Sequence, residues 1–110
     1  MPSAPSLGTL ELSVLLAVVR LGDEAYGLGV RRDVSERLQH DYSVGAIYTT
    51  LQRLEDKKLV TSRSTEPLPV RGGRSRRQFR VTAAGARALR EAQRVATSVW
   101  QGASLRPEHA

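Results

Sequence analysis

The sequence predicts a mainly α-helical fold with one small β-hairpin. Three observations lead to this fold class. The first half of the chain holds three stretches with helical periodicity, two short β-prone segments follow around a loop rich in glycine and proline, and a long amphipathic stretch comes last. Three helices followed by a hairpin is the order of a winged helix-turn-helix, which this chain extends by one C-terminal helix.

The N-terminal part of the chain predicts a flexible tail over residues 1–6 and a buried helix over residues 7–21. Pro2 and Pro5 stand among small residues in the tail. The stretch 7–21 is apolar on nearly every side, which is typical of a helix that several neighbours cover. We therefore expect this helix at the centre of the core.

A second helix is predicted from about residue 25 or 26 to residue 39, after a break at Gly22-Asp23-Glu24. Its apolar residues recur on one side, and its charged residues lie outside. Gly27 and Gly29 weaken the helix locally. We expect these glycines to let a neighbouring helix approach closely.

The third helix is predicted over residues 43–58, after a short turn that suits a helix-turn-helix. Ser43 supplies a side-chain oxygen for the free N–H groups of the first turn, which marks the start of the helix. One stripe of apolar residues recurs with helical phase and is expected to face the core: Val44, Ile47, Leu51 and Leu54.

The opposite side of this third helix is small and polar, and its acids stand only at the far end. It carries Gly45, Thr49, Gln52 and Arg53, with Tyr48 on its flank. A helix whose exposed N-terminal half lacks acids can lie in a DNA major groove, where recognition helices contact bases with their N-terminal residues. Taken alone, the same face fits an ordinary solvated helix surface equally well.

A β-hairpin is predicted after the third helix, from residues 59–66 and 78–81, with a Pro- and Gly-containing loop between them. The stretch from Arg63 to Arg80 has six arginines and one acid, Glu66, so it holds +5 of the net charge of +6. Charge focused on one short segment is typical of a phosphate-binding surface. The alternatives are a basic loop without a ligand, or one that touches an anionic membrane.

The last helix is predicted over residues 83–101, with Thr82 as its cap. A winged-helix core does not need so long an extra amphipathic helix, so we expect its apolar face to meet a second subunit. The predicted dimer interface is Leu89, Ala92, Val95, Ala96, Val99 and Trp100. The alternative is that the helix folds back on the first helix of its own chain.

Composition limits the remaining possibilities. A chain of 110 residues is long enough for one domain and too short for two. The absence of cysteine excludes disulfides and Cys-ligated metal centres, and the two histidines, His40 and His109, are far apart in sequence. We therefore expect neither a metal site nor a cofactor. An enzyme would need a nucleophile, a base and a group that orients them, and the sequence offers no such set, so we expect no enzymatic activity.

Nothing in the sequence predicts a membrane segment or a signal peptide. The strongly apolar, uncharged run Leu12–Val19 is far shorter than the roughly 20 apolar residues that span a bilayer. The start of the chain, Met1–Gly8, lacks a basic region and a small-residue cleavage site. We expect a cytoplasmic protein without a membrane partner.

Several of these residues together resemble the PadR family of bacterial transcriptional regulators. The likeness rests on Tyr26, Gly45-Ala46-Ile47-Tyr48 with the two leucines after them, Leu59-Val60, and the segment 79–85. It covers roughly residues 7–101. Each piece occurs in many winged-helix regulators, whereas their order and spacing together are specific. The short C-terminal part resembles the small members that end after one dimerisation helix.

The resemblance implies a homodimeric winged-helix repressor that binds double-stranded DNA at a partly palindromic operator. The sequence pattern divides the chain into a tail (1–6), a winged-helix DNA-binding domain (7–82), a C-terminal dimerisation helix (83–101) and a second flexible tail (102–110). The resemblance also implies a small-molecule effector at the dimer interface, where Trp100 and the alanine-lined face could form the site. A dimer seam explains these residues equally well.

The expected DNA contacts fall on two elements. On the recognition helix they are Ser43, Tyr48, Thr49, Gln52 and Arg53, and on the wing they are Arg71, Gly72, Gly73, Arg74, Arg76 and Arg77. Tyr48 matches the family's recognition-helix tyrosine, and Gly72, Gly73 and Arg74 match its wing tip. We expect Gln52 to read adenine and the arginines to reach phosphates or the minor groove.

The sequence departs from the family pattern at Ala25, where a Gly usually precedes the tyrosine, and at Thr49, where a Pro often comes after Tyr48. Lys58 stands where a Gly usually ends the recognition helix, which predicts a helix end without the left-handed glycine cap.

Two other binding functions remain open from the sequence alone. A winged helix that binds another protein would present apolar residues on the exposed face of 45–53, where this sequence presents polar ones. A module that coats nucleic acid without sequence preference, RNA included, shares the basic charge. One Phe and three Tyr leave little for stacking on RNA bases.

Overall fold

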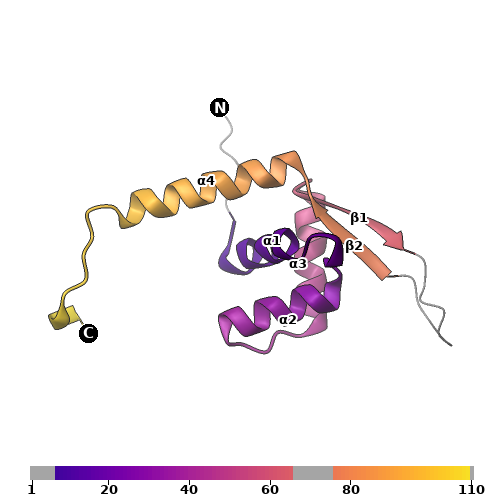
Figure 1. Cartoon of the computed structure of the whole chain (residues 1–110), viewed down its shortest axis with the longest axis horizontal. Helices are drawn as coiled ribbons and strands as arrows, with labels where there is room; N and C mark the ends of the chain where they lie inside the picture. The colour runs from indigo at the N-terminus through magenta and orange to yellow at the C-terminus, as the bar shows by residue number, and fades with distance from the viewer. Residues whose placement is uncertain (1–6, 66–75, 110) are drawn as a thin grey trace.

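The computed structural model describes residues 7–65 and 76–109. Its elements occur in the predicted order (Figure 1), which confirms the mainly helical fold class with one hairpin. They are α1 (Thr9–Leu21), a short 3₁₀ turn η1 (Gly22–Glu24), α2 (Gly27–Leu38), α3 (Val44–Asp56), β1 (Val60–Thr65), β2 (Arg76–Val81), α4 (Ala83–Trp100) and a second 3₁₀ turn η2 (Pro107–His109).

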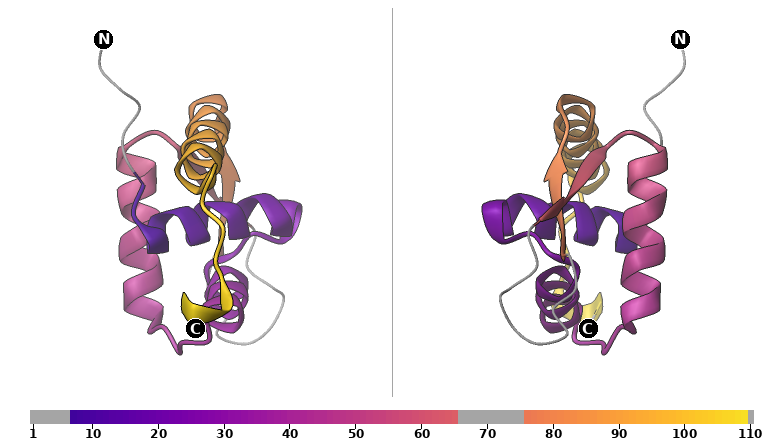
Figure 2. Two further views of the ribbon diagram at one scale, coloured as in Figure 1. Left: turned by 90° about the vertical axis from the view of Figure 1, so that its left-hand side faces the viewer. Right: turned by 90° about the vertical axis from the view of Figure 1, so that its right-hand side faces the viewer.

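Helix α1 lies at the centre of the core, as its sequence predicts. It contacts α2, α3, α4 and β2, and Figure 2 shows it crossing α3 with α2 below it and α4 above it. Val14, Leu15 and Val18 of α1 are buried. The cover is incomplete, however, because Leu16 and Val19 are 36% and 51% exposed on its outer side.

Helix α3 buries three of its four predicted stripe residues. Ile47, Leu51 and Leu54 have no exposed surface, whereas Val44 is 44% exposed because it stands in the first turn, beside an open groove. Thr50 takes a buried position instead, and its hydroxyl donates to the Ala46 carbonyl at 2.8 Å. The predicted cap is confirmed: the backbone N–H of Ala46 donates to Ser43 Oγ at 3.0 Å. The buried stripe of α3 therefore begins at Ile47 rather than at Val44 and includes Thr50.

The C-terminal end of α3 corrects the prediction made for Lys58. This lysine adopts the left-handed conformation, with φ of +64°, that a glycine usually takes at this place. The backbone N–H of Lys58 donates to the Glu55 carbonyl, and that of Leu59 donates to the Leu54 carbonyl, both at 2.9 Å. The helix thus ends in a Schellman motif without glycine, and the lysine bears the steric cost of a left-handed L-residue.

The hairpin is antiparallel and pairs Val60 with Val81 at its base and Thr65 with Arg76 at the end of the described register. A short segment before α2 extends it, because the backbone N–H of Phe79 donates to the Ala25 carbonyl at 2.9 Å and Tyr26 forms an isolated bridge with Gln78. The hairpin is therefore joined to the helices on the α2 side as well as at its root.

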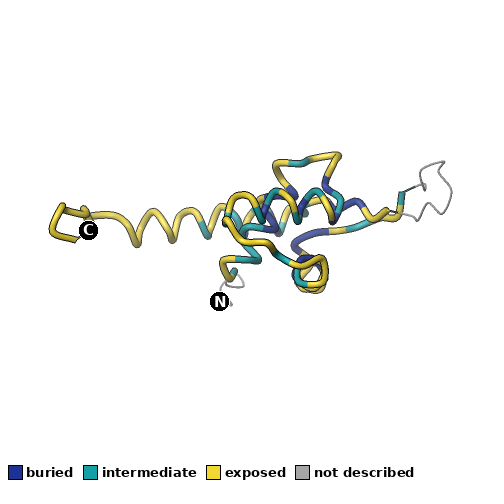
Figure 3. The backbone as a smooth tube through the Cα atoms, turned by 90° about the horizontal axis from the view of Figure 1, so that it is seen from below, coloured by how far each residue is buried: buried dark blue, intermediate teal, exposed yellow. Residues whose placement is uncertain are grey.

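Helix α4 starts at the hairpin and extends away from the other elements (Figure 1). Thr82 caps it, accepting from the Gly85 backbone N–H at 3.0 Å, as predicted. Gly85 is required here because a Cβ would overlap the Leu59 carbonyl. Only the first half packs on the core, and Figure 3 shows that the second half is largely exposed. The alternative to the predicted dimer interface, a fold-back of this helix on α1, is limited to its first turns. The segment after α4, predicted as a flexible tail, is exposed chain with the η2 turn over its described residues 102–109.

Ion pairs join α1 to its neighbours. Arg20 of α1 and Arg37 of α2 both pair with Asp33, and Lys57 pairs with Glu11 of α1 at 2.7 Å. The hydrogen bond from Arg20 lowers the pKa of Asp33 from its ordinary value of 3.8, and the hydrogen bond from Lys57 lowers the pKa of Glu11 from 4.5. Both carboxylates are therefore stabilised in the charged form in the folded state.

Within the described parts of the chain, no group of three or more His, Asp and Glu side chains is placed to hold a metal ion. The helices there are also too short or too polar to cross a membrane. The predicted tail 1–6 lies outside the described residues.

Replacing Lys58 by Gly should raise the free energy of unfolding by about 0.5–1 kcal/mol, because glycine adopts the left-handed conformation without a Cβ clash. Chemical denaturation measures the change. Lys57→Gly is the control, because Lys57 has φ of −79° and pairs with Glu11, so this variant should lose stability. A Lys58→Gly chain that is less stable than the parent would contradict the strained helix end.

The free energy of unfolding should fall as the pH drops below about 4.5, because Glu11 and Asp33 have lowered pKa values in the folded chain. A lowered folded pKa gives stability that is present above the unfolded pKa and lost as the pH falls through the folded one. Denaturation at several pH values should show a shallower fall for a Glu11→Gln, Asp33→Asn double variant. An unchanged profile in that variant would rule out these two carboxylates as its source.

Candidate nucleic-acid interface

The predicted recognition residues of α3 lie on its exposed side. Ser43, Thr49, Gln52 and Arg53 are all exposed, and Ser43 also caps the helix. The Gln52 side-chain N–H donates to Asp56 Oδ1, one turn further along, at 2.9 Å. The structure therefore gathers these four side chains on one helix, with one of them already oriented by a neighbour.

Tyr48 bridges α3 and α2. Its side chain lies against the first turn of α2 so closely that a Cβ on Gly27 would overlap its hydroxyl and ring. This contact confirms the predicted use of Gly27. Gly29 makes only ordinary contacts with Glu24 and Leu21. Because 41% of Tyr48 stays exposed, the residue is both a packing contact and part of the surface.

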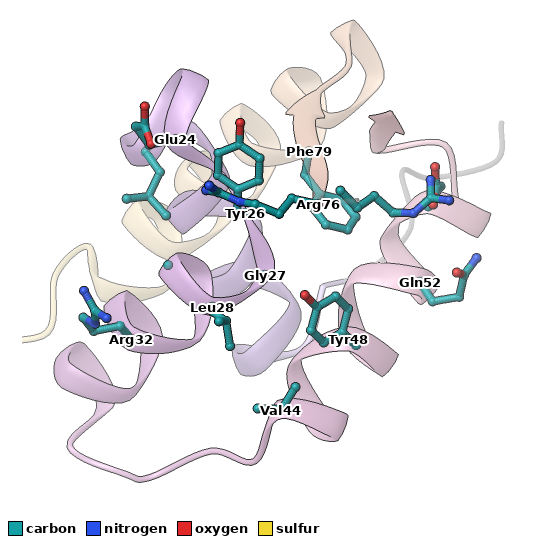
Figure 4. Close-up of a pocket in the computed structure, with 14 residues that line it drawn as sticks. Glu24, Tyr26, Gly27, Leu28, Arg32, Val44, Tyr48, Gln52, Arg76 and Phe79 are labelled. Carbon is teal, nitrogen blue, oxygen red and sulfur yellow. The ribbon is translucent and has the colours of Figure 1, made fainter. Parts of the chain in front are cut away.

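An open groove of about 1080 Å³ lies beside α3. Its walls are the start of α2, the exposed flank of α3 and the start of β2, and Figure 4 shows the side chains that line it. These side chains include Tyr26, Leu28, Tyr48, Gln52, Arg76 and Arg77. The groove thus combines aromatic rings with two of the predicted wing arginines.

Arg76 stacks on Tyr26. The guanidinium carbon lies 3.8 Å from the centre of the tyrosine ring, a cation–π geometry. The sequence alone places Arg76 on the wing and indicates Tyr26 only as a family mark. It does not predict their contact, because the stack depends on the bridge between the segment before α2 and β2.

Arg77 is tied to α3 through a serine. Its Nη1 donates to Ser62 Oγ at 2.9 Å, and Ser62 donates to Glu55 Oε2 at 2.7 Å. These bonds use one of the five N–H donors of Arg77, and the side chain remains exposed. Arg77 is therefore positioned beside α3 with donors left for a ligand.

The side chain of Gln78 joins the two strands of the hairpin to the η1 turn. It is 4% exposed, its Oε1 accepts from Arg63 Nε at 2.9 Å, and its Nε2 donates to the Asp23 carbonyl at 2.6 Å. A buried amide satisfied at both ends specifies one register. The base of the wing is thus held in place by a side chain whose sequence context indicates only an alternating strand.

The predicted wing residues Arg71, Gly72, Gly73 and Arg74 lie outside the described residues. The wing interpretation for them stays a prediction. Arg76 and Arg77 mark the point where the described hairpin ends.

The predicted dimer residues fall into two groups. Leu89 packs partly on the chain's own core, and Ala92 is half-buried. Further along α4, Val95, Val99 and Trp100 are 44%, 72% and 65% exposed, and Ala96 is exposed as well. An amphipathic helix thus leaves the domain with the outer half of its apolar face uncovered.

Comparison with known proteins identifies the same family as the residues did. The model of the transcriptional regulator PadR-like family matches residues 15–91, which is well over half of the chain. No curated protein matches the sequence significantly.

Several solved structures share the fold. A PadR-like transcription factor from Bacteroides fragilis has a TM-score of 0.69 at 22% identity, covering 84% of this chain and 84% of that one. RosR of H. salinarum has a TM-score of 0.66 at 23% identity and covers 93% and 84% of the two chains. A PadR family transcriptional regulator from Eggerthella lenta has a TM-score of 0.64 at 26% identity and covers 84% and 82%.

Proposed function

Because this chain belongs to the PadR-like family of transcriptional regulators, which bind DNA and are not enzymes, we propose that it is a cytoplasmic, homodimeric repressor. Its operator is a partly palindromic duplex, which it reads through the recognition helix predicted over residues 43–58 and binds through an arginine-rich wing. The observation that carries this proposal is the exposed, acid-free first half of α3 beside two positioned arginines.

Base recognition is assigned to α3. Recognition helices contact base edges with their N-terminal residues, and here that part presents Ser43 and Thr49 to solvent. Gln52 is exposed further along the helix. Arg53 comes next on the same exposed side, within reach of a guanine or a phosphate. An apolar exposed face, which a protein-binding winged helix would need, is limited on α3 to Val44 and the ring of Tyr48.

Phosphate binding is assigned to the groove and the wing. Phosphates supply most of the affinity of such proteins, and positively charged side chains that flank the recognition helix suit this role. Arg76 and Arg77 line the groove together with Tyr48. We therefore assign one strand of the DNA backbone to this groove, with the wing residues 71–74 continuing the contact.

The homodimer is assigned to α4. Isologous dimers pair the same patch of both subunits, and the outer half of α4 offers an uncovered apolar patch with Val95, Val99 and Trp100. Two recognition helices related in this way would enter successive major grooves, about 34–36 Å apart. A shallow hollow of about 570 Å³ beside Ala96 and Trp100 is our candidate for an effector site at the same seam.

Replacing Arg76 and Arg77 by Ala should weaken binding to every duplex by a similar factor. The slope of log affinity against log salt should become shallower by about one unit for each phosphate that is no longer neutralised. The double variant Arg90→Ala, Arg94→Ala removes the same charge from exposed positions of α4 and should leave the slope unchanged. A salt titration in which both double variants behave alike would refute the assignment of the groove.

Replacing Val99 by Glu should weaken the dimer by at least about 100-fold, because an unpaired carboxylate would be buried in the seam. Ser98→Glu introduces the same group at an exposed position outside the apolar stripe of α4 and should leave the dimer intact. Light scattering over a concentration series measures both. Equal masses for the parent chain and Val99→Glu would place the interface elsewhere.

A further inference from the structure

The hydrogen bond between Gln52 and Asp56 determines which way the Gln52 amide points. An ionised carboxylate only accepts hydrogen bonds, so the amide nitrogen must face Asp56 and the amide oxygen must face away from it. Both side chains are exposed on the outer side of α3, one helical turn apart. One N–H of Gln52 is thereby used, while its Oε1 and its second N–H remain available.

The position of Asp56 has no evident role in folding. It is the last residue of α3, where the helix dipole disfavours an acid, and it stands on the side that we assign to DNA, where an acid repels phosphate. The neighbouring Glu55 differs, because it accepts from Ser62 and so helps to hold the hairpin. Among the described residues, Gln52 is the side-chain partner that the structure gives to Asp56.

We propose that Asp56 is a specificity-determining positioning residue, which orients Gln52 to read adenine and to reject guanine. This inference rests on the proposed function. In the major groove adenine offers one donor and one acceptor, which match the free Oε1 and N–H of Gln52. Guanine offers two acceptors and therefore needs two donors, one of which Asp56 already occupies.

The test compares affinities for duplexes that differ at one base pair. This base pair is the operator position at which the parent chain prefers one base and the Gln52→Ala variant does not. The readout is the Kd for the duplex with guanine at this position divided by the Kd for the duplex with adenine. Asp56→Ala should lower this ratio by about tenfold, since the charged partner of the hydrogen bond is removed. Asp56→Asn should lower it by a smaller factor, because its amide can either accept from Gln52 or donate to it. Asp56→Lys should invert it, because an ammonium holds the amide oxygen and leaves both N–H groups for guanine.

A change in overall charge cannot mimic this result, because it alters the affinity for both duplexes equally. Glu24→Gln is the control, since Glu24 is exposed beside the same groove and its replacement removes one negative charge without touching Gln52. The ratio for this variant should equal that of the parent chain.

Three results would overturn the inference. The first is a Kd ratio equal to that of the parent chain in all three Asp56 variants, which would mean that Asp56 contributes only its charge and does not orient Gln52. The second is specific binding by the parent chain with no position altered in Gln52→Ala, which would leave the proposed function standing. The third is no specific binding by the parent chain, which would remove the proposed function together with this inference.

Discussion

Helix α3, the β-hairpin and α4 meet at one backbone junction, Lys58-Leu59. The end of α3 closes there through the bond from Leu59 N–H to the Leu54 carbonyl, and β1 begins one residue later. Thr82, at the start of α4, donates to this junction twice, from its hydroxyl to the Lys58 carbonyl at 2.8 Å and from its N–H to the Leu59 carbonyl at 3.0 Å. Gly85 completes the contact because it lets α4 approach the same carbonyl. Helix α3, the hairpin and α4 therefore keep fixed relative directions.

A second set of hydrogen bonds joins the hairpin to the segment before α2. Gln78 and Phe79 join β2 to the segment before α2, and Arg76 stacks on Tyr26 next to them. The groove is consequently walled by three elements whose spacing depends on backbone and buried contacts rather than on surface ion pairs, which contribute little. A dimer formed through α4 would set the orientation of both α3 helices through the junction at Lys58-Leu59.

The sequence predicts the order of the elements well, because helical phase, the Ser43 and Thr82 caps and the alternating strands are local signals. It fails where tertiary contacts decide. Val44 has the right phase for the core, yet it lies beside the groove and stays exposed. Lys58 lacks the glycine that signals a left-handed helix end, but the fold imposes that conformation on it.

The exposure of the candidate DNA-binding residues of α3 was predictable from the sequence, and their contacts were not. Polarity and helical phase suffice to select Thr49, Gln52 and Arg53 as exposed side chains. They do not reveal that Asp56 already holds Gln52, since an acid near a helix end has many uses. The contact of Tyr26 with Arg76 joins residues that are 50 positions apart in the sequence, and no local pattern encodes it.

Direct measurement of DNA binding tests the proposed repressor function. The purified chain would be titrated with duplex from its own upstream region and with a scrambled duplex, at about 50 and 200 mM salt, with its mass measured by light scattering. A dimer should prefer the upstream duplex and should lose on the order of 10³-fold in affinity across this salt range. Equal binding of both duplexes, or no binding to either, would contradict a repressor that reads its own operator through α3 and the wing.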